Sequence, residues 1–172
     1  MTENRLVIDQ EKDGVVYTTA FTEQDVESSI DRQMDIFKEE FGFTDEENDP
    51  VRDMIRTFAH NINPEKECML AVKRDGRLIG SVSFVGEENG IGRLRYVYLE
   101  PDERNKGIGR HMIGLIIDLA REHGYKHLWL STYDILKAAR HVYGLSGFVK
   151  TKESPAQYVS QDIMDEIWER DL

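Results

Sequence analysis

The sequence has little cysteine and no long apolar run. Its one cysteine, Cys68, excludes an internal disulfide, and free thiols are usual in a reducing compartment. No stretch reaches the ~18 consecutive apolar residues that a membrane helix requires. The first residues, MTENRLVIDQEKDG, have neither the apolar core of a signal peptide nor the arginine-rich pattern of a transit peptide. We therefore expect a cytoplasmic protein without a membrane partner.

Basic residues are scarce as well. Lysine and arginine number 22 against 33 aspartates and glutamates, so the formal net charge is −11 at pH 7. A field of this sign repels nucleic acid and anionic membranes, and it favours cationic or amine-bearing partners at long range. The same acidic residues also keep a protein soluble. The negative net charge therefore argues against nucleic-acid binding.

Residues for metal binding or nucleophilic catalysis are not grouped along the chain. His123 and His127 are four residues apart, but Gly124 ends the helix between them, so the two cannot share one helix face. Cys68 alternates within a strand pattern and is interpreted as a packing residue. No Ser-His-Asp set has local support. We expect no metal and find no reason for a covalent acyl-enzyme.

The length of 172 residues indicates a single domain, residues 1–172. Apolar residues at three- and four-residue spacing predict helices, and alternating runs predict strands. The pairs Asp75-Gly76 and Asn89-Gly90 predict hairpin turns. The expected helices are Glu23–Glu40, Pro50–Ala59, one from about Gly107 to Gly124, and one N-capped by Asp134. The expected strands are Val15–Phe21, Cys68–Lys73, Leu78–Val85, Ile91–Glu100, His127–Thr132, one opening at Gly147-Phe148, and one or two within Tyr158–Ile163 and Ile167–Leu172.

An antiparallel meander followed by strand–helix–strand–helix–strand predicts an α/β domain with a mixed (α+β) sheet of six or seven strands and about four helices. The acidic run at 45–50 is predicted to be a solvated loop between helices. The last strand, Ile167–Leu172, is a candidate sheet edge that could pair two chains as a homodimer.

The strongest chemical signal is the segment ERNKGIGR, residues 103–110. A strand stopped by Pro101, a glycine turn and a helix start together form an anion site, because the first N–H groups of a helix lack intrahelical partners. Neither the P-loop pattern GxxxxGK[ST] nor the complete dinucleotide pattern GxGxxG is present. The glycines would let a diphosphate approach the main chain, and the cations would complement its charge. The candidate binding residues are Arg104, Asn105, Lys106, Gly107, Ile108, Gly109 and Arg110.

The spacing R-x-x-G-x-G in this segment resembles the coenzyme A loop of the GNAT superfamily of N-acetyltransferases. The resemblance extends over Leu94–Phe148, with the elements in the same order and with Tyr143 followed by Gly147-Phe148. The stretch Ser131–Phe148 and the terminus IWERDL look most like the acetyltransferase half of bacterial fusions with a MarR-type winged helix, whose DNA-binding half is absent from this sequence. The resemblance implies a GNAT-like fold and an acyltransferase that uses acetyl-CoA. It implies transfer to the primary amine of a small molecule or peptide, by direct attack in a ternary complex.

The resemblance also implies a set of site residues. The pyrophosphate would lie on the N–H groups of about Lys106–Arg110, and the pantetheine arm along Val97, Tyr98 and Leu99, where an N–H could stabilise the thioester oxygen. Tyr143 is the candidate general acid, with an ordinary core tyrosine as the alternative. Glu100 is the candidate base, acting through a water, with a solvated strand end as the alternative.

Two features near these residues carry separate expectations. Many members of the superfamily have an asparagine seven residues before the tyrosine, where this sequence has Leu136, so that contact with the coenzyme should be missing. Phe41 and Phe43, on either side of a glycine, could line the acceptor site or could only end a helix with core aromatics. A coenzyme A-binding sensor without chemistry, and a nucleotide-binding module, are the alternative functions.

Overall fold

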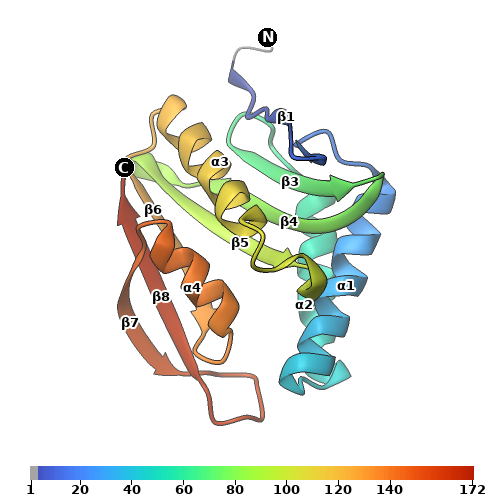
Figure 1. Cartoon of the computed structure of the whole chain (residues 1–172). Helices are drawn as coiled ribbons and strands as arrows, with labels where there is room; N and C mark the ends of the chain where they lie inside the picture. The colour runs from blue at the N-terminus through green and yellow to red at the C-terminus, as the bar shows by residue number, and fades with distance from the viewer. Residues whose placement is uncertain (1–3) are drawn as a thin grey trace.

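Residues 4–172 form one mixed sheet with helices on both faces (Figure 1). The structure is a computed structural model, and these are the residues it describes. Within them, eight strands lie in the order β1-β2-β3-β4-β5-β6-β8-β7. Their bounds are β1 Asp9–Lys12, β2 Val15–Thr18, β3 Glu67–Arg74, β4 Arg77–Gly86, β5 Ile91–Leu99, β6 His127–Tyr133, β7 Val149–Pro155 and β8 Met164–Asp171. The mixed α/β fold is confirmed, with one strand more than the largest number predicted.

Four α-helices over residues 4–172 cover the sheet. They are α1 Glu23–Phe41, α2 Asp45–His60, α3 Ile108–Glu122 and α4 Lys137–Leu145. Consecutive residues of β3 lie on opposite faces of the sheet. Leu70 belongs to the cluster that includes α3, whereas Met69 belongs to the cluster made with α1 and α2. The helices α3 and α4 therefore lie on one face, and α1 and α2 on the other, as Figure 1 shows.

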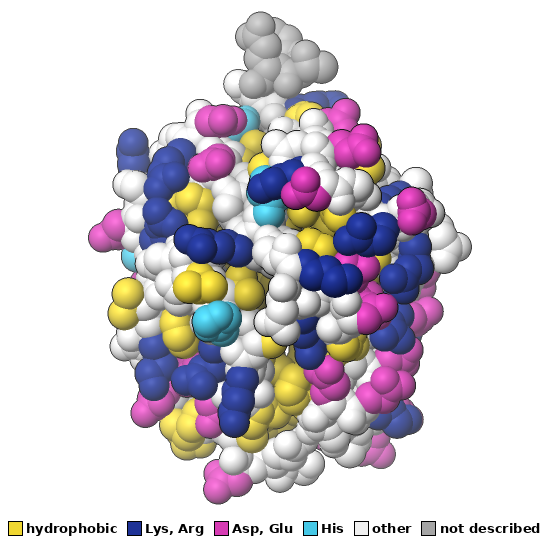
Figure 2. Space-filling model, in the orientation of Figure 1, with side chains coloured by type: hydrophobic (Ala, Val, Ile, Leu, Met, Phe, Trp, Pro, Cys, Tyr) yellow, Lys and Arg dark blue, Asp and Glu magenta, His cyan; other side chains and the backbone are white. Residues whose placement is uncertain are grey.

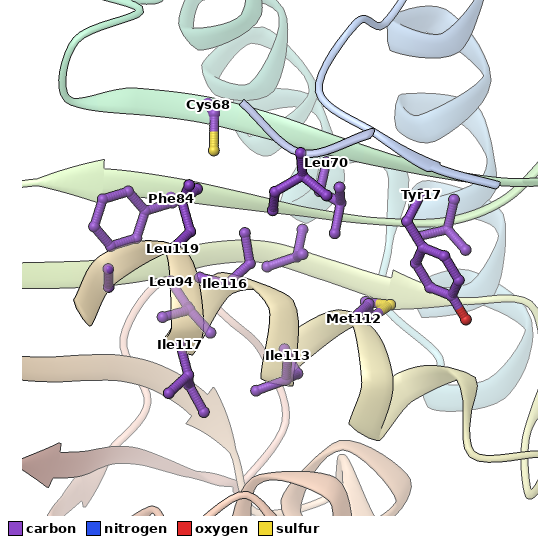
Figure 3. Packing of buried hydrophobic residues seen from close by; sticks show 14 of the residues in the cluster. Tyr17, Cys68, Leu70, Phe84, Leu94, Met112, Ile113, Ile116, Ile117 and Leu119 are labelled. Atoms are coloured by element: carbon purple, nitrogen blue, oxygen red, sulfur yellow. The ribbon is translucent and has the colours of Figure 1, made fainter. Parts of the chain in front are cut away.

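The main core lies under α3. Its apolar stripe, which includes Met112, Ile113 and Ile116, points into the sheet and meets Leu70 of β3 and Phe84 of β4 (Figure 3). All five side chains are fully or almost fully buried. Burying a side chain of this size stabilises a fold by roughly 1.5–3 kcal/mol. The start of α3 is therefore fixed by the packing of the rest of that helix.

The sheet opens between its central strands β5 and β6, because they pair over only part of their length. The strands β1 to β5 form an antiparallel meander, and its Asp75-Gly76 and Asn89-Gly90 turns have the positive φ angles that such pairs favour. β5 then pairs in parallel with β6, but only Ile91–Arg93 with His127–Trp129. Beyond those residues the two central strands have no ladder between them, so a space must open there.

Two expectations about helix starts are wrong. The acidic run at 45–50 is the first part of α2 and not a loop, because Thr44 and Glu47 form a reciprocal capping box that begins the helix earlier. Asp134 does not cap α4: the helix begins at Lys137, and the Asp134 carboxylate accepts from the N–H of Met164 at 3.1 Å.

The C-terminal strands also differ from expectation. Residues 158–163 do not form a strand. The last strand, β8, lies between β6 and β7, so the predicted sheet edge at Ile167–Leu172 is wrong. The edge is β7 instead, and all of its residues are exposed. The small strand β1, absent from the sequence-based prediction, forms the other edge.

Candidate active site

A bulge in β5 shapes the site. Arg95 pairs with Ser83 of β4 and Tyr98 pairs with Ser81, so two residues of β5, Tyr96 and Val97, lie opposite one residue of β4. Tyr96 has φ 54°, in the left-handed region that an aromatic residue rarely adopts. The bulge takes two peptide units out of the ladder at the point where β5 leaves β6. Main-chain groups are thus available at the mouth of the opening.

A first cavity begins at this bulge and runs between α3 and α4. It holds about 740 Å³, open to solvent. The C-terminal end of β5 forms its floor, and α1, α3 and α4 supply the walls. Among its lining residues are Val97, Leu99, Gly109, Val142 and Tyr143.

A second cavity lies across β5 on the side of α2. It holds about 1130 Å³ and is lined by α1, α2, α4, β5, β6, β8 and the segment before β8. Side chains shared by both cavities mark the place where the two meet: Gln33, Phe37, Val97, Leu136, Ala139 and Tyr143. Two ligands entering from opposite faces of the sheet could therefore meet beside Val97 and Tyr143.

The predicted anion loop lies at the outer end of the first cavity. Gly107 is the residue before α3 and has φ 82°, a conformation that glycine adopts without strain. The first intrahelical bond runs from the N–H of His111 to the carbonyl of Gly107. The N–H groups of Ile108, Gly109 and Arg110 therefore lack intrahelical partners, as a helix start requires.

Gly109 allows α3 to begin close to its neighbours. A Cβ on Gly109 would lie 3.4 Å from a methyl of Val142 in α4 and 3.7 Å from one of Leu99 in β5. A larger side chain would push these elements apart and block the floor of the cavity.

The loop cations differ in their partners. Arg104 donates twice to Glu40 of α1, both at 2.9 Å, and Lys106 lies 3.4 Å from Glu103. Arg110 is exposed and has no ion pair within residues 4–172. Of the three predicted cations, Arg110 is thus the one ready to meet an anion without first leaving a carboxylate.

A buried ion pair fixes the loop to the sheet. Glu103, 4% exposed, accepts two hydrogen bonds from Arg74 of β3, both at 3.0 Å. The Arg74 guanidinium holds the pKa of Glu103 below its usual value, so the carboxylate stays charged. No local pattern predicts this ion pair, because its two residues, Arg74 and Glu103, are far apart in the chain.

Tyr143 lies where the two cavities meet and is 4% exposed. Its ring packs on Phe148, with the ring centroids 6.3 Å apart. Burial raises the pKa of Tyr143, and no neighbouring charge or hydrogen bond from residues 4–172 offsets that rise. The hydroxyl is therefore protonated at neutral pH and can donate a hydrogen bond, and its raised pKa makes it a weaker acid than an exposed tyrosine. The two sequence interpretations, core residue and site residue, both describe its position.

Glu100 is not a solvated strand end. It is 5% exposed, and both carboxylate oxygens accept from Arg32 of α1 at 2.8–3.1 Å. It lines neither cavity. To accept a proton it would have to compete with a bidentate arginine, so the position gives a catalytic role no support.

Four aromatic and apolar residues singled out in the sequence are distributed between the two cavities. Phe41 lines the first cavity, whereas Phe43 lines the second and packs against Tyr133, with ring centroids 5.6 Å apart. Leu136 lies at the junction of the two, where it presents an apolar side chain. Tyr98 lines the first cavity, and its side chain packs with Ile36 of α1.

Sequence reasoning missed the polar lining of the second cavity. Arg93 and Arg95 alternate along β5 and both line it, together with Thr132 of β6. Their alternation was a usable signal, since residues two apart in a strand share a face.

Within residues 4–172, no group of three or more His, Cys, Asp or Glu side chains is placed to hold a metal ion, and no helix there is both long and apolar enough to cross a membrane.

Comparison with known proteins gives the same architecture. Streptothricin acetyltransferase of Streptomyces lavendulae is 33% identical over 92 residues, which cover 52% of this chain and 48% of that protein. The chain thus spans about half the length of the curated relatives it matches. A GNAT acetyltransferase structure from Staphylococcus aureus Mu50 has a TM-score of 0.73 at 18% identity, covering 96% of this chain and 98% of that one.

A structure described as a streptothricin acetyltransferase of Bacillus anthracis, solved in complex with acetyl coenzyme A, has a TM-score of 0.60 at 19% identity and covers 67% of this chain and 68% of that one. The sequence model described as "Acetyltransferase (GNAT) family" matches residues 30–148, which include the C-terminal part of α1, the β5 bulge, the anion loop and Tyr143. The chain belongs to the GNAT family of acetyltransferases.

Proposed function

We propose that this protein transfers the acetyl group of acetyl-CoA to a primary amine by direct attack in a ternary complex. The observation that carries the proposal is the junction of the two cavities beside Val97 and Tyr143. One cavity leads from the anion loop and the other from the opposite face of the sheet. A donor and an acceptor can therefore be bound together, as a ternary complex requires.

The donor fits the first cavity. Its pyrophosphate would lie on the free N–H groups at the start of α3, with Arg110 beside it. Lysine and arginine side chains are prominent on the face that carries α3 and α4, despite the net acidity of the chain (Figure 2). The pantetheine arm would run along Val97–Leu99, where the bulge leaves main-chain groups outside the ladder.

The chemistry follows from this placement. The neutral amine attacks the thioester carbonyl carbon, and an N–H of the Val97–Leu99 segment stabilises the oxygen as it becomes negative. Collapse of the tetrahedral intermediate breaks the carbon–sulfur bond. The thiolate of coenzyme A takes the proton of Tyr143, and the amine nitrogen loses one to water.

Direct transfer is favoured over an acyl-cysteine. Cys68, the one cysteine of the chain, is 4% exposed in β3 and lines neither cavity. Burial raises the pKa of its thiol to about 12, so it holds almost no thiolate at neutral pH.

The test is a calorimetric titration with acetyl-CoA, followed by thiol release in the presence of amines. The panel should include amino acids, polyamines, aminoglycosides, peptides and streptothricin, because streptothricin gives its name to the first relative above. Turnover with at least one amine is expected. Binding of acetyl-CoA without turnover on any amine would instead favour the coenzyme A sensor. The finer likeness to MarR-fusion acetyltransferases stays a prediction.

Arg110→Glu should raise the dissociation constant of acetyl-CoA about tenfold or more. The change removes a charge-assisted contact, worth about 1.5–3 kcal/mol, and places a negative charge beside the pyrophosphate. Arg121→Glu is the matched control, because Arg121 is exposed near the other end of the same helix. Equal affinities of the two variants, measured by calorimetry, would remove Arg110 from the donor site.

A further inference from the structure

Two arginines face the second cavity without a carboxylate partner. Arg93 and Arg95 of β5 both line it, and neither has a carboxylate oxygen within 4.0 Å among residues 4–172. The Nε atom of Arg93 is buried and has no hydrogen-bond partner in that part of the chain. Buried polar atoms are nearly always paired, so this one indicates a group that the protein alone does not supply.

The two guanidinium groups are held in place by aromatic rings. Arg93 lies over Trp129, 4.2 Å from the ring centroid, and Arg95 lies over Tyr96 at 4.7 Å. Arg93 also donates to Ser131 at 3.4 Å. Burial and the like charge of Arg95 lower the pKa of Arg93. The two guanidinium groups are thus held in position and repel each other. An anion bound between them would remove that repulsion.

The acidic residues nearby offset the charge of the pair only from a distance: Glu87 and Asp165 interact electrostatically with Arg93 but form no ion pair with it. The Glu47 carboxylate accepts from the N–H groups of Thr44 and Ser160 at 3.0 and 2.7 Å. Asp165 lines the cavity but forms no ion pair within the described chain. Glu87, outside the cavity lining, accepts from the indole N–H of Trp129 at 2.6 Å.

Other arginines of this acidic chain, unlike Arg93 and Arg95, have carboxylate partners. Arg32, Arg74 and Arg140 each hold a buried carboxylate in a bidentate pair. In a chain with 33 acidic residues, leaving two neighbouring arginines unpaired inside a cavity is costly to folding. The cost is explained if a ligand supplies the missing anion.

The other lining residues of the second cavity indicate what the rest of that ligand is like. Phe43, Tyr133 and Val51 give it an apolar wall. Arg95 precedes Val97 by two residues with the bulge between them, so the separation along the strand is at most the roughly 7 Å of a regular strand. An anion on the guanidinium groups and an amine at the junction can therefore belong to one small molecule.

We propose that the acceptor is an amino acid or a closely similar small amine, with a carboxylate bound by Arg93 and Arg95 and an apolar side group against Phe43 and Tyr133. This inference rests on the proposed function, since it names the acceptor class of that same site. It also fits both charges: an amino acid is a net-neutral zwitterion, so the acidic surface does not repel it at long range, and the local arginines bind its carboxylate.

The experiment compares matched acceptors with saturating acetyl-CoA: L-phenylalanine and L-leucine, their carboxamides, and the amines that lack the carboxyl group. Turnover should be at least about tenfold faster in kcat/KM for the acids than for the amides or amines, because an ionic hydrogen bond is worth about 1.5–3 kcal/mol. Polyamines serve as the cationic comparison.

Substitutions test the assignment to the two arginines. Arg93→Gln and Arg95→Gln should each raise KM for the acids about 10- to 100-fold with little change for the amides. Arg93→Lys should recover part of the loss, and Arg121→Gln on the surface of α3 should lose nothing. Melting curves and acetyl-CoA titrations of every variant establish that each is folded and binds its donor.

The outcomes separate the two proposals. Equal turnover of acids and amides, or preference for polyamines, overturns the carboxylate assignment while transfer to amines stands. Arginine variants that slow acids and amides alike also overturn it. Turnover with none of the amines, when acetyl-CoA binds, overturns the proposed function and this inference with it.

Discussion

Tyr143→Phe should lower kcat by about 100-fold or more and leave the dissociation constant of acetyl-CoA unchanged. A positioned general acid contributes about 10²–10⁴-fold, and the hydroxyl is the one group that this substitution removes. Because no protein group in residues 4–172 hydrogen-bonds that hydroxyl, its removal leaves no partner unsatisfied. The variant should therefore melt at or above the temperature of the original protein.

A second buried tyrosine supplies the control for this prediction. Tyr17 is 2% exposed in the same core and lines neither cavity. Tyr17→Phe should keep its kcat, measured by thiol release with the best acceptor. If Tyr143→Phe also keeps its kcat, Tyr143 is a core residue and another group protonates the thiolate.

Local patterns predicted the elements that depend on local interactions. The helices α1 and α3 and the two hairpin turns could be predicted, because amphipathic spacing and Asn-Gly or Asp-Gly pairs act over a few residues. The start of α2 was also encoded locally, in the Thr44–Glu47 capping box, but the run of acidic residues and Pro50 concealed it. The position of β8 inside the sheet depends on pairing with β6 and β7, which no local pattern reveals.

The candidate site likewise combines features that local sequence determines with features that depend on how distant segments pair. The glycine turn and the helix start after it lie within one segment and could be predicted locally, whereas the β5 bulge depends on the register of the neighbouring strand. The second cavity draws its lining from six helices and strands, so the alternation of Arg93 and Arg95 could place them on one face of β5 but could not show that this face lines a cavity. Net charge pointed to a cationic acceptor, but the charge that a bound ligand meets is local, and in this cavity it includes two arginines without a carboxylate partner among residues 4–172.

Glu166→Ala should lower the free energy of unfolding by about 3–5 kcal/mol, the usual cost of leaving one member of a buried ion pair alone. Glu166 of β8 is 1% exposed. Its oxygens accept from Arg140 of α4 at 2.9 and 3.2 Å and from the indole N–H of Trp168 at 3.0 Å. The melting temperature should fall by roughly 6–20 °C for a chain of this size. Activity should fall as well, since the same helix carries Tyr143.

A surface glutamate on the neighbouring strand is the matched control. Glu153 of β7 is exposed and pairs with Lys150 at 2.9 Å, and exposed pairs of this kind contribute about 0–1 kcal/mol. Glu153→Ala should therefore melt within a few degrees of the original protein. Glu166→Gln should fall between the two alanine variants, because its amide oxygen can still accept one bond from Arg140. If Glu166→Ala melts like Glu153→Ala, the pair between α4 and β8 does not hold the helix, and the position of Tyr143 must depend on its apolar packing against Phe148.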